Sequence, residues 1–250
     1  MTKDQIYGQQ TRVKPSEVTT SSGTKFIGAT FLYFTIALVI TFAVVAALGS
    51  ILNFAIFNND AVAFDTIYYI LAGALVAYIP VLIWVHIAGR RNGATLGPAF
   101  FTYSIVMGVL LSPICVIFDF WTIAIALGST ALAFAVMALI AWTTKKDLSK
   151  LAIFGFGLLI GVLVLSLFNL IFYFVAPATY TIIYALVSSL FFIVVLIFTI
   201  VDLNNVKKIA ENGGAARNVA FLCALNLYVD FIYIFIRLLR IIAIIAASRK

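Results

Sequence analysis

Charged residues are scarce in this chain. Only 10% of its 250 residues are Asp, Glu, Lys or Arg, whereas 64% are hydrophobic and the mean hydropathy is +1.17. Soluble domains usually carry about 25% charged residues, so this composition excludes an ordinary soluble domain. It is typical of an all-α polytopic membrane protein, in which long apolar helices cross the bilayer.

Cysteine and histidine are also rare, with two cysteines and one histidine in the whole chain. Cys115 and Cys223 fall in apolar runs, and neither has a second thiol at metal-ligand spacing. A disulfide framework or a zinc site is therefore not supported, and we interpret both as buried structural cysteines. Because His86 is the only histidine and no GxSG-like motif surrounds a serine, serine-histidine catalysis is excluded as well.

Seven long apolar runs predict seven transmembrane helices in a single domain, residues 26–250. The clearest run is bracketed by Trp121 and Trp142, which are 21 residues and about 31 Å apart on a helix, the thickness of a bilayer core. Residues 1–25 are polar and rich in Ser and Thr, which predicts a disordered tail. The predicted spans are residues 26–52, 66–90, 97–118, 121–142, 151–175, 178–212 and a last span from 219 onward.

The basic residues predict the orientation of these helices. The N-terminal tail and the connections after the second, fourth and sixth spans hold 12 of the 16 Lys and Arg residues. The other connections hold none and carry the acids Asp60, Asp65 and Asp119. The positive-inside rule therefore predicts a cytoplasmic N-terminus, and we expect a multi-pass protein of the cell (plasma) membrane. Since the basic charge follows topology, the net charge of +7 does not indicate nucleic-acid binding.

The orientation of the C-terminus stays open. Seven full spans would place it outside the cell, whereas a seventh helix that re-enters or stops short would return it to the cytoplasm. Arg249 and Lys250 favour the cytoplasmic side by the same rule.

Two acids, Asp202 and Asp230, lie inside the last two predicted spans. Ionisable groups at membrane depth are costly and usually face a partner or a water-filled path. Gly213-Gly214 breaks the helix between them, so an antiparallel hairpin would bring both acids to about the same depth. Carboxylates roughly 4 Å apart repel by about 4 kcal/mol at an effective dielectric near 20, and such a pair tends to hold one proton near neutral pH.

Local pairing is the alternative for these acids. Asp202 could pair with Lys207 or Lys208, and Asp230 with Arg237 or with a group on another helix. Each acid would then be neutralised separately, without a role in function.

Three further residues are candidates beside the acids. Arg90 ends the second span on the cytoplasmic side, where it could reach the acids or extend to the lipid headgroups. His86 shares its helix face at i, i+4 and is either a packed residue or a pH sensor. Asn169 lies deep in the fifth span, where an interhelical hydrogen bond is the usual role and a place in an ion path the other one.

Several segments of the chain resemble one known family. TTKKDLSKLAIFGFGLLIGVLVLSLFNLIF, VDLNNVKK and LNLYVDFIYIFIRLLRI are similar to the matching parts of the Bax inhibitor-1-like membrane proteins, in the same order over about residues 26–245. The resemblance implies six helices around a central seventh helix and a pH-sensitive calcium leak. It also implies that Asp202 and Asp230 form a proton-sharing sensor, onto which Arg90 latches.

The chain departs from the family pattern at three positions near these acids. Val201 replaces a tyrosine that the family often has before the first acid, and Tyr233 replaces an asparagine after the second. Arg237 is an additional charge in the last span. The two acids are retained, but the hydrogen bonding around them and the ion selectivity are expected to differ from the family pattern.

The sequence thus leads to one preferred function and two alternatives. We expect a pH-sensitive calcium leak channel without a bound cofactor. In this channel Asp202 and Asp230 would bind protons and calcium ions within the lipid bilayer. Two carboxylates supply only part of the six to eight oxygens that calcium prefers. The first alternative is a non-transporting modulator that binds another membrane protein, such as a protease or a cell-death regulator. The second, an intramembrane aspartyl protease, requires GxGD at the second acid where this chain has LYVD, so we expect no enzyme activity.

Overall fold

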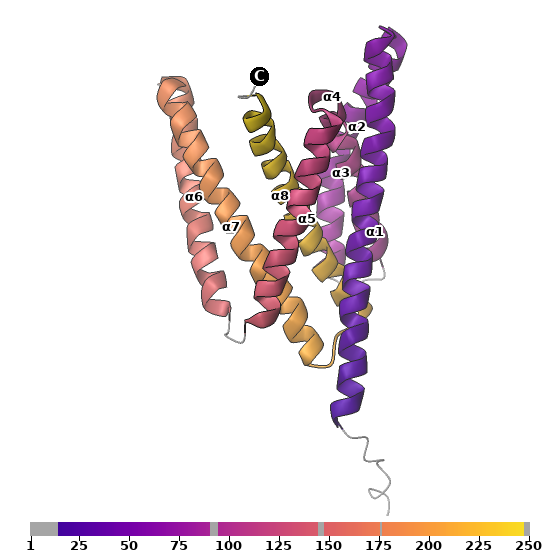
Figure 1. Cartoon of the computed structure of the whole chain (residues 1–250), viewed down its shortest axis with the longest axis vertical. Helices are drawn as coiled ribbons and strands as arrows, with labels where there is room; N and C mark the ends of the chain where they lie inside the picture. The colour runs from indigo at the N-terminus through magenta and orange to yellow at the C-terminus, as the bar shows by residue number, and fades with distance from the viewer. Residues whose placement is uncertain (1–14, 91–94, 145–147, 176, 248–250) are drawn as a thin grey trace, which may run out of the picture.

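The chain folds as an all-helical bundle (Figure 1). The computed structural model describes residues 15–90, 95–144, 148–175 and 177–247, and no strand occurs within these ranges. Seven helices are long and one, α4, is a single turn. The helices are α1 (Pro15–Phe57), α2 (Ala61–Arg90), α3 (Leu96–Leu111), α4 (Ile114–Ile117), α5 (Phe120–Thr143), α6 (Ser149–Val175), α7 (Pro177–Glu211) and α8 (Arg217–Ala247).

The outward faces of the helices are apolar, as a lipid environment requires. Six segments of the described chain are long and apolar enough to cross a membrane, namely those of α1, α2, α3 with α4, α5, α6 and α7. Large apolar side chains on these helices, such as Val76 and Leu167, are 74% and 67% exposed. Exposure on this scale is unfavourable in water but not against lipid tails. The chain is a multi-pass membrane protein.

The predicted ends of two helices need correction. α1 begins at Pro15 rather than at residue 26, so residues 15–25 are helical and are not part of a disordered tail. A tertiary contact explains part of this extension, because a Cβ on Gly23 would collide with the carbonyl oxygen of Ala210 near the end of α7. The third span is interrupted: α3 ends at Leu111, and Pro113 stands at the N-cap of α4, where its missing N–H group costs no hydrogen bond.

The turn between α7 and α8 confirms the helix break predicted at Gly213-Gly214. Both glycines have positive φ values, 95° and 80°, which residues with a Cβ atom rarely adopt. Their N–H groups donate to the carbonyl oxygens of Ala210 and Ile209 at 3.0 and 2.9 Å, and so close the end of α7. The turn sets α7 and α8 side by side in opposite directions.

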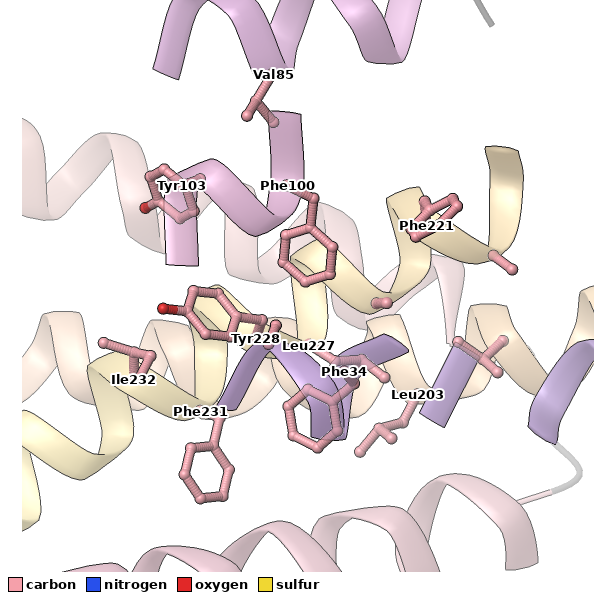
Figure 2. Packing of buried hydrophobic residues seen from close by; sticks show 14 of the residues in the cluster. Phe34, Val85, Phe100, Tyr103, Leu203, Phe221, Leu227, Tyr228, Phe231 and Ile232 are labelled. Carbon is pink, nitrogen blue, oxygen red and sulfur yellow. The ribbon is translucent and has the colours of Figure 1, made fainter. Parts of the chain in front are cut away.

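Helix α8 carries much of the buried core. It packs against α1, α3, α5 and α7, and its Leu227, Tyr228 and Ile234 are fully buried. Figure 2 shows Tyr228 close to Phe100 of α3, with Phe34 of α1 nearby; the Phe100 and Tyr228 ring centroids are 5.6 Å apart in an edge-to-face arrangement. Edge-to-face aromatic pairs add about 1 kcal/mol beyond their buried area.

A buried hydrogen-bond chain crosses this core. Thr41 of α1 donates to the carbonyl oxygen of Ser104 in α3 at 2.9 Å. The hydroxyl groups of Thr41 and Tyr228 are 2.7 Å apart. Because Thr41 has one hydroxyl hydrogen and gives it to Ser104, the Tyr228 hydroxyl is the donor in the second bond. These two hydrogen bonds join α1, α3 and α8 without a charged group.

Candidate functional site

A cavity of about 730 Å³ lies between α2, α7 and α8. α3 contributes Tyr103 to its wall and α6 contributes Leu159. Most of the wall is apolar or aromatic, and both of its carboxyl groups come from α7 and α8. From α2 the lining residues are Tyr78, Leu82, Val85, His86 and Gly89; from α7 and α8 they are Phe191, Val194, Val195, Phe198, Asp202, Leu222, Leu225, Asn226, Val229 and Asp230.

Asp202 and Asp230 line this one cavity, but they are staggered along the hairpin. Asp202 lies nine residues before the end of α7, and Asp230 lies thirteen residues after the start of α8. The difference of four residues corresponds to about 6 Å of helical rise. Counted along its helix, Asp230 therefore lies about one turn farther from the α7–α8 turn than Asp202, where the sequence predicted about equal distances.

A second, smaller cavity of about 300 Å³ lies nearer the α7–α8 turn, and Asp202 lines this cavity too. Asn205, Lys208 and Cys223 are among its other lining residues, while Leu222 and Asn226 line both cavities with Asp202. Asp202 thus stands between the turn and the cavity that holds Asp230.

Asp230 has an incomplete set of hydrogen-bond partners. Its carboxyl group is within hydrogen-bonding reach of the Thr199 hydroxyl, while its Oδ2 atom is buried without a partner among the described residues. The Thr199 hydroxyl is also 2.8 Å from the carbonyl oxygen of Val195. A threonine has one hydroxyl hydrogen, so it can donate to only one of these two acceptors at a time. A protonated Asp230 resolves this competition, since it can donate to the Thr199 oxygen.

Asp202 has a polar neighbour on its own helix. Its carboxyl group is within hydrogen-bonding reach of the Asn205 side chain, one turn further along α7. The carboxyl groups of Asp202 and Asp230 are close enough to interact electrostatically. No Lys or Arg side chain is among the described residues that line the larger cavity. Two ionised carboxylates in such surroundings are costly, so the cavity favours a proton or another cation.

Two cations proposed as local partners of the acids are bonded elsewhere. Lys207 donates to the carbonyl oxygens of Trp142 and Thr144 at 2.8 and 3.1 Å, where it caps the C-terminal end of α5. Arg237 donates to the hydroxyl groups of Ser188 and Ser189 on α7. Neither of these two cations bonds to Asp202 or Asp230, whereas Lys208, the other proposed partner of Asp202, lines the smaller cavity with it.

The predicted latch and sensor residues lie on α2. α2 ends at Arg90, as predicted, but the side chain of Arg90 is outside the part of the structure that is described. His86 does line the larger cavity, and its Nδ1 is 3.0 Å from the carbonyl oxygen of Leu82. Since a carbonyl only accepts hydrogen bonds, Nδ1 carries the hydrogen in this contact.

Asn169 lies apart from this site. It is buried on α6 with 6% of its surface exposed, and it is not among the residues that line the cavity. Its Oδ1 atom has no hydrogen-bond partner among the described residues. With the residues that the structure describes, this oxygen does not form the interhelical hydrogen bond expected from the sequence.

Several polar residues of the site were not identified from the sequence. Thr199 and Asn205 flank Asp202 at i−3 and i+3, and Asn226 precedes Asp230 at i−4. Side chains three or four residues apart share a helix face, so this spacing was a usable signal. Tyr103 comes from a distant helix, and spacing along the chain gives no such signal for it.

The described residues contain no group of three or more His, Cys, Asp or Glu side chains that could hold a metal ion. Calcium at the two acids would need additional oxygens, for which the Asn205, Asn226 and Thr199 side chains and water are the nearest sources. Such a site suits weak binding of a passing ion.

Comparisons with known proteins agree on one group of relatives. A family model described as "Inhibitor of apoptosis-promoting Bax1" matches residues 23–247. An uncharacterized membrane protein of Streptococcus pyogenes serotype M1 is 35% identical over 177 residues, which are 70% of this chain and 73% of the relative. The inner membrane protein YbhL of Escherichia coli strain K12 is 31% identical over 180 residues, 68% of this chain and 73% of the relative. An uncharacterized protein of Borreliella burgdorferi is 26% identical over 219 residues, 86% of this chain and 90% of the relative.

Proposed function

This chain belongs to the Bax inhibitor-1-like family of membrane proteins, and on that premise we propose that it is a pH-sensitive calcium leak channel of the plasma membrane. One observation carries the proposal: Asp202 and Asp230 line a single cavity whose described lining has no Lys or Arg. A proton and a calcium ion would compete for the same carboxylates there. We propose no enzymatic activity, because the second acid follows LYV rather than the GxG of aspartyl proteases.

In the proposed topology the N-terminus is cytoplasmic and α8 is the seventh, central span. The basic residues at the α7–α8 turn support a cytoplasmic turn. The packing of α8 against α1, α3, α5 and α7 supports its central place. In Figure 1, α8 starts near the end of the bundle where α1 begins and finishes at the opposite end. The smaller cavity would then open toward the cytoplasm and the larger one would lie deeper in the membrane.

The proposed gate is the interface between α2 and the α7–α8 pair. α2 packs mainly against α3 and α1, and the cavity separates it from α7. In the closed state the acid pair shares one proton and binds the Arg90 side chain, and α2 lies close to α7 and α8. A change in proton number or the arrival of calcium alters the charge that Arg90 and α2 face. α2 then shifts relative to α7 and α8, and the path along Asp202 opens.

Calcium flux into liposomes tests this proposal. Purified wild type, Asp202→Asn and Asp230→Asn are reconstituted at equal density, and flux is followed with an enclosed calcium indicator over a range of pH. We expect the flux of both variants to lose its pH dependence, because an amide does not titrate. Asp65→Asn is the matched control, since Asp65 is an exposed acid outside the cavity lining, and it should keep the wild-type profile.

Two results would contradict the proposal in different ways. An unchanged pH profile in both site variants would reject the acid pair as the sensor. Wild-type flux equal to that of empty liposomes at every pH would reject the channel and favour the alternative, in which the chain binds and modulates another membrane protein.

A further inference from the structure

The larger cavity has more room and more apolar wall than a calcium ion needs. Its volume of about 730 Å³ falls within the roughly 300–1,000 Å³ typical of small-molecule sites. Four aromatic side chains, Tyr78, Tyr103, Phe191 and Phe198, contribute to the wall. A hydrated ion gains little from such a wall, whereas an organic ligand with an apolar body gains from burying its surface there.

The charged groups of the cavity determine whether such a ligand carries a positive or a negative charge. Asp202 and Asp230 are on its wall, and the Oδ2 atom of Asp230 is buried without a hydrogen-bond partner among the described residues. The faces of aromatic rings also attract cations, by about 0.5–2 kcal/mol for each well-placed contact. Carboxylates and rings therefore favour the same ligand, one that joins a positive centre to an apolar body.

We propose that this cavity binds a lipophilic organic cation, such as an ammonium or phosphonium ion with aromatic or alkyl substituents. Its charged centre lies beside Asp230 and Asp202, and its apolar body lies against the α2 wall and Phe191. The proposal goes beyond the calcium leak and does not require that calcium crosses the membrane.

A lipid acyl chain is the competing occupant of the same space. α6 packs on α7 while α2 packs on α3 and α1, and the cavity lies between these two groups of helices. An acyl chain would be held by apolar contact alone, so it would not distinguish a cation from an anion, nor an aspartate from an asparagine. Charge selectivity therefore separates the two occupants.

The binding experiment uses two probes of the same shape and opposite charge. Radiolabelled tetraphenylphosphonium and tetraphenylborate are dialysed against the purified full-length protein in detergent, with empty micelles subtracted. We expect saturable binding of one phosphonium per chain and at least tenfold weaker binding of the borate. Asp230→Asn should weaken phosphonium binding at least tenfold, and Asp65→Asn should leave it unchanged. Equal binding of both ions, or no saturable phosphonium binding, would overturn the proposal.

A second variant keeps the test valid if an acid substitution disturbs folding. Val229 lines the cavity with 44% of its surface exposed, so Val229→Phe fills part of the space while both carboxyl groups are retained. It should weaken phosphonium binding several-fold while the gel-filtration profile stays that of the wild type. Wild-type affinity in this variant would place the phosphonium outside the cavity.

The pH dependence of binding identifies the groups responsible. The titratable groups that face the cavity are Tyr78 and His86 from α2, Tyr103 from α3, Asp202 from α7 and Asp230 from α8. The phosphonium carries a fixed charge, so any pH dependence comes from the protein. Binding should weaken on acidification in wild type and in His86→Gln, and should be flat in the double variant of both acids. Loss of the pH dependence in His86→Gln alone would contradict the assignment to the acids.

The outcomes of this experiment and of the flux experiment are independent. Phosphonium binding without calcium flux would remove the leak and keep the organic cation site. Calcium flux with wild-type pH dependence, but without charge-selective phosphonium binding, would keep the leak and remove the organic cation site.

Discussion

Asp230 lies about one helical turn farther from the α7–α8 turn than Asp202, counted along their antiparallel helices, and both side chains line one cavity. Asp202, Leu222 and Asn226 also line the smaller cavity nearer the turn. Asp202 thus lies toward the turn and Asp230 farther along the hairpin, and the polar side chains of Asp202 and Asn226 join the two cavities. In the proposed channel, an ion that entered from the turn would meet the two charges one after the other.

The polar path between the cavities predicts a role for Asn226. Asn226→Leu replaces a polar wall group shared by both cavities with an apolar one of similar size and leaves both acids in place. We expect calcium flux in liposomes to fall on the order of tenfold, which corresponds to about 1.4 kcal/mol in the barrier. The pH dependence should remain, in contrast to Asp230→Asn. Full flux in this variant would exclude the path through Asn226.

Arg237 predicts a clamp between α7 and α8 in the half of the hairpin away from the turn. Its hydrogen bonds to Ser188 and Ser189 join the helices, and bonds to a charged donor contribute about 1.5–3 kcal/mol each. Arg237→Ala should lower the thermal unfolding temperature in detergent. Arg237→Lys should recover only part of the loss, because a lysine lacks the planar fork that reaches two hydroxyls. Wild-type stability in Arg237→Ala would show that the clamp contributes nothing.

The buried bond between Thr41 and Tyr228 predicts an asymmetry between its two partners. Tyr228→Phe removes one donor and leaves the bond from Thr41 to Ser104 intact, so it should cost about 1 kcal/mol. Thr41→Val keeps the shape but leaves both the Tyr228 hydroxyl and the Ser104 carbonyl without this partner, so it should cost more, about 2–3 kcal/mol. Thermal unfolding of the two single variants and the double variant measures this. A larger cost for Tyr228→Phe than for Thr41→Val would contradict the assignment of Tyr228 as the donor.

The close approach of α3 to α1 predicts that Gly108 cannot be enlarged. A Cβ there would lie 2.8 Å from the carbonyl oxygen of Thr41 and 2.8 Å from the Cβ of Val44, so the helices would have to separate. Gly108→Ala should destabilise the protein by about 1–3 kcal/mol. Gly128→Ala on α5 is the control, since a Cβ there meets nothing within 4 Å, and it should be neutral or slightly stabilising. Equal stability of the two variants would contradict this packing.

Much of the fold could be predicted from the sequence because it depends on local signals. Apolar runs long enough to span a bilayer located the helices, and Gly213-Gly214 located the turn that pairs α7 with α8. The start of α1 could not be predicted in this way. Residues 15–25 are polar in sequence, and their helix continues to a contact of Gly23 with Ala210 of another helix, which no local signal records.

The candidate site was predicted in part for the same reason. Asp202 and Asp230 stood out because acids in apolar runs are rare, and the hairpin brought them to one cavity. Their stagger depends on how many residues the turn consumes on each side, which the sequence alone does not fix. The partners of Lys207 and Arg237 lie on other helices, whereas spacing along one helix had suggested that each would pair with the acid on its own helix.

The titration of the two carboxyl groups tests the central claim most directly. Infrared spectroscopy of the protonated carboxyl C=O band, recorded over a range of pH, counts how many protons the acids hold. We predict one protonated carboxyl group near neutral pH in wild type, absent from the double variant of Asp202→Asn and Asp230→Asn. Each single variant should change the pH dependence of the acid that remains, because that acid has lost a charged neighbour. If each remaining acid titrates as it does in wild type, the two carboxyl groups are independent and the account is contradicted.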